Sequence, residues 1–456
     1  MRDLGFPATA DAFADHLRDS LAALQRTRTV AQRGRVVQAF GTLLRVSGVQ
    51  ASIGQSCRLV DPDTGRTLAA EVVGFADGHT LLVPLAPLHG LASQAEVEML
   101  PGSGEVRVGD ALRGRVLDSF GQPLDGRPLP PGLVPQPLLA PAPDALSRPP
   151  IATPFATGVR AIDALLTVGT GQRLGVFAAA GGGKSTLLGM LARQASADVT
   201  VIALIGERGR EVREFIDDSL GDAGLATSVL VVATSDRPAM ERVRAAQAAT
   251  AIAEGFRAQG ARVLLLMDSV TRYARALREI GLSIGEPPVR RGFPPSVFAE
   301  MPRLFERVGN DGRGSITAFY TVLLEDEDSA DPVAEEVRSI LDGHVVLSRE
   351  LGQASHYPAI DVLASVSRTF TRVASPEHRR AAAHVRALMA KHAEIRFLLQ
   401  VGEYRAGSDP LADEAIARLP DIHALLRQPA TEATPFDTTL ARLAALAPAV
   451  AHGTAA

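Results

Sequence analysis

Between residues 174 and 194 a glycine-rich turn joins an apolar run to a segment with helical character, and no other feature constrains the fold as strongly. The turn reads Ala178-Ala-Ala-Gly-Gly-Gly-Lys184-Ser-Thr186. Small residues allow successive backbone N–H groups to converge on phosphate oxygens, and the first turn of a helix adds a positive dipole end. This context favours a phosphate-binding loop over an ordinary glycine-rich turn. The residues expected around the phosphates are Ala180, Gly181, Gly182, Gly183, Lys184, Ser185 and Thr186.

Two side chains of this loop can act on a bound nucleotide. Lys184 would bring its charge to the β and γ phosphates, and the Ser185 hydroxyl would bind Mg²⁺. The loop therefore predicts a site for a nucleotide and Mg²⁺.

The loop belongs to a long alternation of apolar and helical segments between Ile151 and about Ser367. The expected strands are Leu174–Ala178, Val199–Gly206, Ser228–Thr234, Arg262–Met267, Ser315–Leu324 and Ile360–Ser365. The expected helices are Ser185–Gln194, Arg210–Leu220, Pro238–Gln259 and Arg272–Ile280. Such an alternation predicts an α/β core whose parallel sheet is covered on both faces, with the site at the carboxyl ends of the strands.

Outside this region the sequence shows other patterns. The length of the whole chain, 456 residues, suggests two or three domains. Short β-rich runs separated by turn signals predict a small β-barrel over residues 27–100. The expected strands are Arg35–Phe40, Thr42–Val46, Gln55–Val60, Leu68–Phe75 and Thr80–Pro84. Ten of the thirty prolines lie between Pro123 and Pro150, which predicts a stiff, extended connection within the core domain, residues 101–376.

Both ends of the chain are expected to be helical. Phe13, Leu17, Leu21 and Leu24 recur at helical spacing, so residues 1–26 form one amphipathic helix that packs on its own chain or docks on a partner. Residues 377–456 show no strand signal and are predicted to form a small helical domain. Its expected helices are Arg379–Leu399, Pro410–Arg418, Asp421–Leu426 and Thr438–Ala447.

Three charged residues follow core strands at positions that suit phosphate chemistry. Asp268 ends an apolar strand, where a carboxylate can hold Mg²⁺ through water. Glu207 also follows a strand and can polarise an attacking water, while Arg208 can meet the γ-phosphate. Taken alone, either carboxylate could equally be a solvated loop residue.

Other polar groups do not suggest a metal site. The consecutive acids of residues 325–331 are interpreted as a solvated loop. The ten histidines show no paired ligand spacing, which argues against a zinc site.

Composition bounds the function further. The chain carries 47 basic and 51 acidic residues, a net charge of −4, and has no Trp and four Tyr, which argues against nucleic-acid binding. Its single cysteine, Cys57, is expected to be a buried apolar residue in a reducing compartment. No apolar run is long enough to span a bilayer, so we expect an intracellular protein.

A set of motifs resembles the type III secretion ATPases, which are related to the catalytic subunits of rotary ATP synthases. The resemblance covers about residues 30–420. The motifs are Gly181-Gly-Gly-Lys-Ser-Thr-Leu-Leu-Gly-Met190, Gly206-Glu-Arg-Gly-Arg-Glu-Val212, Asp268-Ser-Val-Thr-Arg-Tyr-Ala274, Gly285-Glu-Pro-Pro288, Arg291-Gly-Phe-Pro-Pro-Ser-Val-Phe298, Leu341-Asp-Gly-His344, His356-Tyr-Pro-Ala-Ile-Asp361 and Gly407-Ser-Asp-Pro410. It implies an oligomerising N-terminal β-barrel, a RecA-like core and a C-terminal helical domain.

The resemblance also implies roles for individual residues, with ATP and Mg²⁺ as cofactors. Glu207 would orient the hydrolytic water, and Glu211 would join Asp268 as an outer-shell Mg²⁺ residue. Tyr357 would lie against the adenine, with Tyr404 as a second wall. Arg368 would be an arginine finger that reaches the nucleotide of a neighbouring subunit.

One departure from the family pattern concerns the phosphate loop. The family's loop usually reads Ala-Gly-Ser-Gly-Val-Gly-Lys-Ser, whereas Ala179, Ala180 and Gly182 replace its second, third and fifth residues here. The Lys and Ser chemistry is retained. An extra glycine costs entropy when the loop is ordered, and the two alanines restrict its backbone.

The function implied is that of a homohexameric ATPase that energises protein export. The implied partners are a stator-like regulator at the N-terminal helix, a central coiled-coil stalk, export chaperones with their secreted substrates, and the inner-membrane export gate at its cytoplasmic face. Residues 336–342 and 361–368 favour the injectisome over flagellar export. The alternatives are a Rho-type nucleic-acid translocase and a ring subunit that binds nucleotide without hydrolysing it.

Overall fold

The computed structural model describes residues 33–100, 104–179, 181–324 and 331–447, together with Leu17 and Leu21. Apart from Leu17 and Leu21, the predicted helix of residues 1–26 lies outside the described residues, as do Ala180 and most of the acidic loop 325–331. The chain forms two compact units, Met1–Gly102 and Ser103–Ala456. Each unit is described by itself below.

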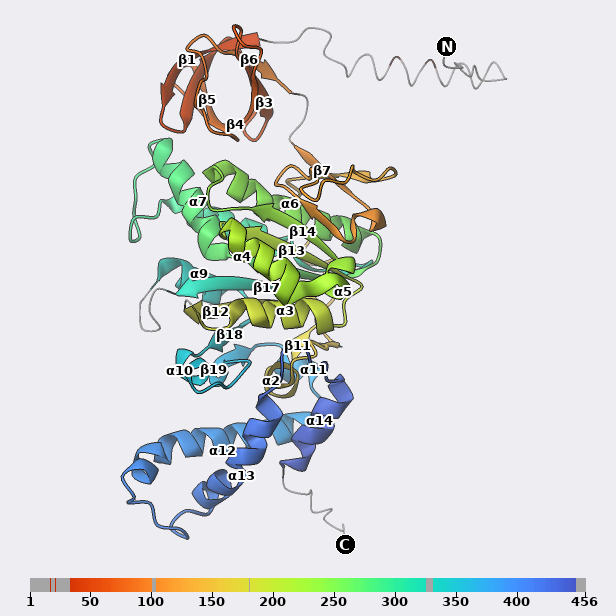
Figure 1. The fold of residues 1–456 in the computed structure, drawn as a ribbon, viewed down its shortest axis with the longest axis vertical. Helices are drawn as coiled ribbons and strands as arrows, with labels where there is room; N and C mark the ends of the chain where they lie inside the picture. The colour runs from red at the N-terminus through yellow and green to blue at the C-terminus, as the bar shows by residue number, and fades with distance from the viewer. Residues whose placement is uncertain are drawn as a thin grey trace, which may run out of the picture. The chain divides into compact units, whose positions relative to one another are not determined.

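The first unit is a closed six-stranded β-barrel, which confirms the predicted barrel (Figure 1). The strand order is β1-β2-β5-β4-β3-β6. The strands are β1 (Arg33–Phe40), β2 (Leu43–Ser47), β3 (Ser56–Val60), β4 (Thr67–Ala76), β5 (His79–Pro84) and β6 (Glu96–Met99). Alternate residues point inward to form its core, and they include Cys57, whose thiol donates to the Ala70 carbonyl oxygen at 3.3 Å. Burial raises the pKa of this thiol to about 12, as expected for a buried apolar role.

The second unit is built on a mainly parallel sheet. Its order is β19-β18-β12-β17-β15-β13-β14-β8, and the short β16 pairs with β17. The strands are β8 (Arg115–Leu117), β12 (Arg173–Ala179), β13 (Val199–Ile205), β14 (Ser228–Ala233), β15 (Arg262–Asp268), β16 (Gly309–Asn310), β17 (Ser315–Leu324), β18 (Gly343–Leu347) and β19 (Ile360–Ser367). The predicted parallel sheet is confirmed for the strands from β18 to β8. Two strands depart from it, because β19 runs antiparallel to β18 and β16 antiparallel to β17.

Helices lie on both faces of this sheet, as the alternation predicts (Figure 1). They are α2 (Arg160–Leu165), α3 (Lys184–Gln194), α4 (Gly209–Glu214), α5 (Gly221–Ala226), α6 (Ala239–Ala258), α7 (Val270–Ser283), α8 (Pro295–Glu306), α9 (Pro332–Ile340), α10 (Arg349–Gln353) and α11 (Phe370–Val373), with a π-helical turn η2 (Phe215–Leu220) and a 3-10 turn η1 (Asp110–Leu112). Asp331, the last residue of the predicted acidic loop, begins α9 by accepting from the Val333 and Ala334 amides.

The proline-rich stretch is mostly irregular, as predicted. It contributes one short edge strand, β9 (Val134–Pro137), which pairs with β7 (Glu105–Val108). Pairing at an edge tolerates proline because one side of the strand needs no donors. A second two-stranded sheet joins β10 (Pro154–Phe155) to β11 (Val168–Gly169).

The C-terminal part is helical, and it packs on the core within the same unit. Its helices are α12 (Pro376–Gln400), α13 (Pro410–Leu426) and α14 (Phe436–Ala445). The expected break between residues 418 and 421 is wrong, because α13 continues through Pro420. Pro420 is exposed, so water can reach the carbonyl that loses its partner there. The buried Arg160 ties α2 to this part by donating to the carbonyl oxygens of Leu425 and Arg427. None of the described helices combines the length and apolar character that crossing a bilayer requires.

Candidate active site

The glycine-rich turn leaves the carboxyl end of β12 and enters α3 with left-handed backbone at two glycines. Gly181 has φ of 80° and Gly183 of 81°, a region in which a Cβ atom is strained. The Gly182 amide donates to the Ala179 carbonyl oxygen at 3.2 Å, and the Leu187 amide donates to Gly183 at 3.0 Å. The conformation therefore directs the turn back over the first residues of α3, as a phosphate-binding loop requires.

A cavity of about 510 Å³ opens beside this loop. It brings together most of the residues predicted from the sequence. Its lining comprises Ala179, Gly181, Gly182, Gly183, Lys184, Ser185, Thr186, Leu204, Glu207, Arg208, Glu211, Val212, Phe215, Asp268, Arg272 and Leu323. Besides Arg208, the cavity contains a second arginine, Arg272 on α7, for which the sequence predicted no role.

Lys184 lies at the centre of the charged groups. Its Nζ atom is 2.7 Å from Asp268 Oδ1 and 3.2 Å from Glu207 Oε1. Burial alone would lower the pKa of Lys184, but the charges of Asp268 and Glu207 outweigh it and raise the pKa. The ammonium group is therefore retained, and a triphosphate could take the place of the two carboxylates as its partner.

The two glutamates differ in their environment. Burial raises the pKa of Glu207 to about 7, with a further contribution from the charge of Asp268. The pKa of Glu211 is lowered, chiefly because its carboxylate accepts a hydrogen bond from Glu207. A carboxylate with a pKa near 7 is suited to accepting a proton from water.

Asp268 is held by a residue that sequence reasoning missed. The buried Thr321 on β17 donates its hydroxyl to Asp268 Oδ1 at 2.8 Å. In the parallel pairing of β15 and β17, Met267 lies beside Tyr320, so Asp268 and Thr321 are the next residues along both strands. The available signal was a hydroxyl residue near the carboxyl end of this buried strand, beside three apolar residues.

The donor set fits Mg²⁺ bound together with a nucleotide. A hydroxyl at Ser185 and carboxylates at Asp268 and Glu211 line the cavity, and oxygen donors are those that Mg²⁺ prefers. Within the described ranges, no cluster of three or more His, Cys, Asp or Glu side chains could hold a metal ion alone. Mg²⁺ usually takes several of its ligands from phosphates and water, so this sparse set suffices.

The two predicted adenine walls have different surroundings. Tyr357 is 44% exposed, and its ring lies close to the phosphate loop, where a Cβ atom built on Gly183 would be 3.6 Å from Cε1. Neither tyrosine is among the residues that line the cavity. The Tyr404 hydroxyl donates to Asp413 at 2.8 Å, and no described contact brings Tyr404 to the phosphate loop. This arrangement supports Tyr357 as a wall and gives no support to Tyr404.

Arg368 lies away from the cavity of its own chain. It follows β19, is exposed, and donates through its main-chain amide to the Asp342 carbonyl oxygen at 3.0 Å. Its guanidinium donates to the Arg338 carbonyl oxygen at 3.1 Å. Because Gln172, which precedes β12, contacts the residues beside Arg368, this arginine and the phosphate loop lie at opposite ends of β12.

Comparison with known proteins adds a clear relationship. The chain is 55% identical over 419 residues to a type 3 secretion system ATPase of Xanthomonas euvesicatoria, covering 91% of this chain and 94% of that protein. The chain belongs to the type III secretion ATPase family. Three family models match it: the ATP synthase alpha/beta family β-barrel domain at residues 36–101, the nucleotide-binding domain of that family at 158–367, and the T3SS EscN ATPase C-terminal domain at 374–445.

Other relatives of this type III secretion ATPase come from both branches of the family. A flagellum-specific ATP synthase of Bacillus subtilis is 46% identical, covering 93% of this chain and 97% of that protein. The structure of assembled EscN from enteropathogenic E. coli matches with a TM-score of 0.85 at 47% identity, covering 91% of this chain and 99% of that one. The protein is thus an ATPase, with the barrel, the nucleotide-binding core and the helical C-terminal part of its family.

Two glycines of the phosphate loop allow the unusual loop of this ATPase to be tested. Gly182 has no left-handed backbone, and an added Cβ would meet the Ala179 carbonyl oxygen at 3.2 Å and the Cβ atoms of Leu347 and Ala178 at 3.7 and 3.8 Å. We expect Gly182→Val to bind a fluorescent ATP analogue at least as tightly, with turnover equal or up to about threefold higher, because a stiffer loop loses less entropy.

Gly183→Ala is the matched comparison. Its left-handed backbone makes a side chain cost about 1–2 kcal/mol, and the added Cβ would approach the Tyr357 ring. Nucleotide binding should weaken about tenfold. Weaker binding and slower turnover for Gly182→Val would contradict the entropy argument.

Proposed function

We propose that this chain assembles into a homohexameric ring that hydrolyses MgATP at its subunit interfaces and energises protein export through a type III secretion apparatus. One observation carries the proposal: Lys184, Glu207 and Asp268 line the cavity, whereas Arg368 does not. An exposed arginine remote from its own cavity is suited to act on the cavity of a neighbour. The assembled EscN structure supports the ring as the form of a relative.

In this site each residue has a distinct task. The loop amides and Lys184 bind the phosphates, Tyr357 stacks on the adenine, and Glu207 orients water and accepts its proton. Bound Mg²⁺, held by Ser185 and through water by Asp268 and Glu211, would supply positive charge to the phosphates.

Two arginines complete the proposed site. Arg208, on the rim of the cavity, would meet the γ-phosphate. Arg368 of the adjacent subunit would add charge as the phosphoryl group transfers, which makes hydrolysis depend on assembly.

The proposed partners follow from the relatives. EscN is also known in complex with its central stalk EscO, and we extend a coiled-coil stalk to this chain. We further propose that the N-terminal helix binds a stator-like regulator, that the C-terminal helices bind chaperones and secreted substrates, and that the ring works in the cytoplasm against the export gate of the inner membrane.

We assign the protein to an injectisome rather than to a flagellum. The support comes first from residues 336–342 and 361–368, which are similar to the injectisome members of the family. Relatives named type 3 secretion system ATPase are 55% and 52% identical to it, whereas two flagellum-specific ATP synthases are 46% and 47% identical.

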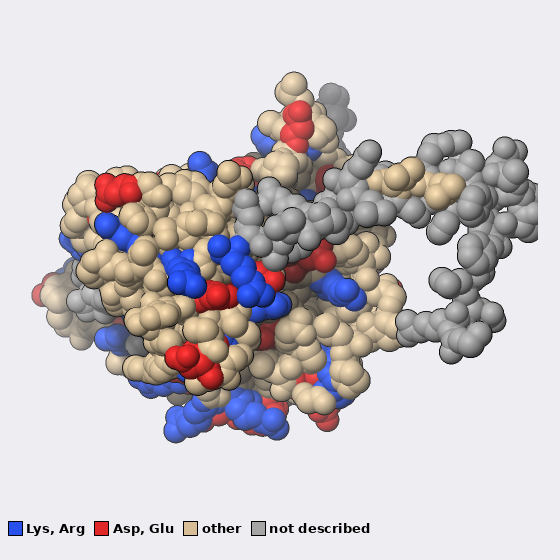
Figure 2. Space-filling model, turned by 90° about the horizontal axis from the view of Figure 1, so that it is seen from above, with Lys and Arg blue, Asp and Glu red and all other residues tan. Residues whose placement is uncertain are grey.

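A nucleic-acid translocase is less well supported. The barrel does expose two aromatic rings, Phe40 on β1 and Phe75 on β4, where the sequence suggested few candidates. These strands are separated by β2 and β5 in the barrel, so the rings do not sit on neighbouring strands as a stacking track would require. On the face shown in Figure 2, the visible Lys and Arg side chains of the described residues lie among Asp and Glu rather than in one basic area.

The test combines assembly with export. Turnover per subunit should rise with protein concentration in parallel with the ring mass measured by light scattering, and RNA should not stimulate it. Deleting the gene in its source bacterium should abolish secretion through the injectisome and leave motility intact. Turnover that is independent of assembly, or that is stimulated by RNA, would overturn the proposal, and loss of motility alone would assign it to the flagellum.

A further inference from the structure

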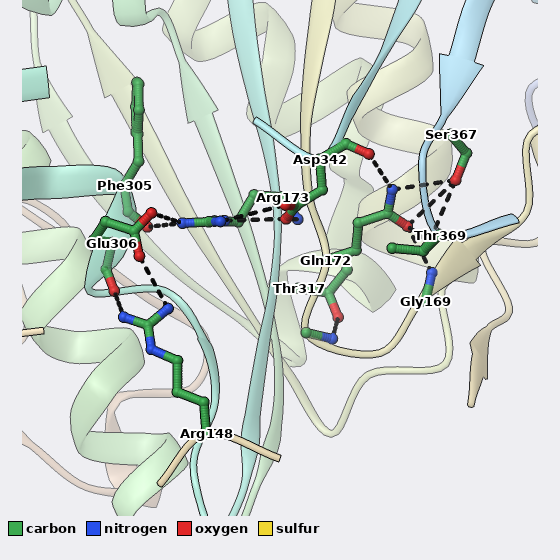
Figure 3. Close-up of polar contacts among 11 residues, drawn as sticks. Arg148, Gly169, Gln172, Arg173, Phe305, Glu306, Thr317, Asp342, Ser367 and Thr369 are labelled. Atoms are coloured by element: carbon green, nitrogen blue, oxygen red, sulfur yellow. Dashed lines mark hydrogen bonds and ion pairs between the residues drawn. The ribbon is translucent and has the colours of Figure 1, made fainter. Parts of the chain in front are cut away.

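The buried glutamine just before β12, Gln172, makes a complete set of side-chain hydrogen bonds (Figure 3). The Gln172 side chain has no exposed surface. Its Nε2 donates to the Asp342 carbonyl oxygen at 2.9 Å and to Ser367 Oγ at 3.2 Å. Its Oε1 accepts from the Gly169 amide at 2.8 Å and from Thr369 Oγ1 at 2.5 Å. Both amide donors and both acceptor directions are therefore used.

These contacts surround Arg368. Ser367 and Thr369 are its two neighbours in the chain, and both are held by the Gln172 amide group. The main-chain amide of Arg368 donates a hydrogen bond to the Asp342 carbonyl oxygen, which also accepts from Gln172. One side chain thus contacts the hydroxyl groups of the residues before and after the exposed arginine, and the carbonyl oxygen that accepts from the Arg368 amide. It touches neither the guanidinium nor the cavity.

The first residue of β12, Arg173, contacts Asp342 from the other side (Figure 3). Arg173 donates through Nε to Asp342 Oδ2 at 3.1 Å and through Nη1 to Glu306 Oε1 at 2.7 Å. Arg148 also pairs with Glu306, at 3.2 Å. Moving Asp342 would break these ion pairs. The Asp342 carbonyl oxygen, which accepts from both Gln172 and Arg368, is therefore held in place.

We propose that Gln172 is a positioning residue for Arg368. It holds residues 367–369 in the one conformation that presents the guanidinium to the nucleotide site of the adjacent subunit. The inference rests on the proposed trans role of Arg368 and deepens it. A guanidinium displaced by about 1 Å loses much of its effect on a transition state, so loosening this backbone should act on turnover rather than on binding.

A competing explanation places the effect at the other end of β12. This strand runs from Arg173 to Ala179 and leads into the phosphate loop, so a change at Gln172 could disturb the cavity of its own subunit. The two explanations differ in which subunit of an interface carries the defect, and the experiment is designed to separate them.

The first measurement compares variants of the full chain in assembled rings. Gln172→Ala should lower kcat about 10–100-fold and change the KM for MgATP by less than about twofold. Gln172→Glu keeps the acceptor and loses the donor, so it should fall between Gln172→Ala and the unchanged chain. Gln194→Ala is the matched control, because the Gln194 amide also donates to a main-chain carbonyl, that of Ala430, and makes no contact at Arg368.

The second measurement mixes two variants before assembly. A Gln172→Ala subunit has an intact cavity but a misplaced Arg368. A Glu207→Gln subunit has a correctly placed Arg368 but a cavity that cannot activate water. At about one interface in four of a randomly mixed ring, an intact cavity meets an intact arginine. The mixture should therefore recover about a quarter of full turnover, although each variant alone is nearly inactive.

The outcomes distinguish the inference from the function beneath it. Arg368→Ala mixed with Glu207→Gln is the reference, and its recovery tests the trans arginine alone. Recovery in the reference but not with Gln172→Ala would overturn the positioning role and favour a defect in the phosphate loop. No recovery in either mixture would overturn the trans role of Arg368 itself.

Circular dichroism tests whether Gln172→Ala folds. If it does not fold, Thr369→Val, which removes one contact to Gln172, replaces it in the same mixture with the same expected recovery. Failure of this variant to recover would likewise overturn the positioning role.

Discussion

Replacing Glu207 with Gln is expected to reduce ATP turnover about 10²–10⁴-fold while leaving nucleotide affinity within a few fold. The amide has the shape of the carboxyl group but cannot accept a proton from water. Lys184 loses one of its two carboxylate partners and keeps Asp268, at 2.7 Å. The loss should therefore fall on the chemical step, and single-turnover hydrolysis together with titration of a fluorescent ATP analogue would measure both quantities.

Glu214→Gln provides the matched control for this prediction. Glu214 is the last residue of α4, the short helix that follows Glu207, and its half-exposed carboxylate pairs with Arg210 outside the cavity. Its replacement should leave turnover within about twofold, because an exposed ion pair contributes little. Unchanged hydrolysis in Glu207→Gln would show that another group activates water, and the catalytic assignment would have to be abandoned.

Replacing Arg368 with Ala is expected to lower turnover in assembled rings about 10³-fold or more. The arginine lies outside its own cavity, so nucleotide binding by a single chain should not change. Ring formation, followed by light scattering, should also persist. The diagnostic result is a variant in which the concentration-dependent rise in turnover disappears while the low activity of the isolated chain remains.

Two further variants sharpen this second prediction. Arg368→Lys keeps the charge but not the planar fork, so it should remain impaired to within about tenfold of Arg368→Ala. Arg372→Ala, an exposed arginine one helical turn along the chain, should behave like the unchanged protein. Equal losses at both arginines would indicate a general effect of charge at this surface rather than a specific role of Arg368.

Sequence reasoning was most successful where local chemistry determines structure. The strand before the phosphate loop and the helix after it are close to their predicted bounds, because an apolar run and a glycine-rich turn are local signals. The strands β6 and β18 were missed. They have four and five residues, too few for a clear alternation, and their place is determined by pairing with distant strands.

Within the site, the predicted residues were recognised from sequence motifs. The missed residues contact groups that are distant in the sequence and close only in the folded chain. Lys184, Glu207 and Asp268 stand at recognisable positions after strands. Thr321 holds Asp268 only because β15 and β17 are neighbours in one particular register. Gln172 has no motif of its own, since its partners are up to 197 residues away in the chain. Such residues become visible only when strand order and register are known.

The strand β12 also has a consequence for how a ring would pass signals. Seven residues, about 23 Å of extended backbone, separate Gln172, which contacts the neighbours of Arg368, from the phosphate loop. Each subunit would take its arginine from one neighbour and offer its own to the other, so every interface is head-to-tail. A change at one nucleotide that travels along β12 would then reach the next site always on the same side of the subunit. Coupling between nucleotide sites would then run in one direction around the ring, and the direction of β12 within each subunit would determine it.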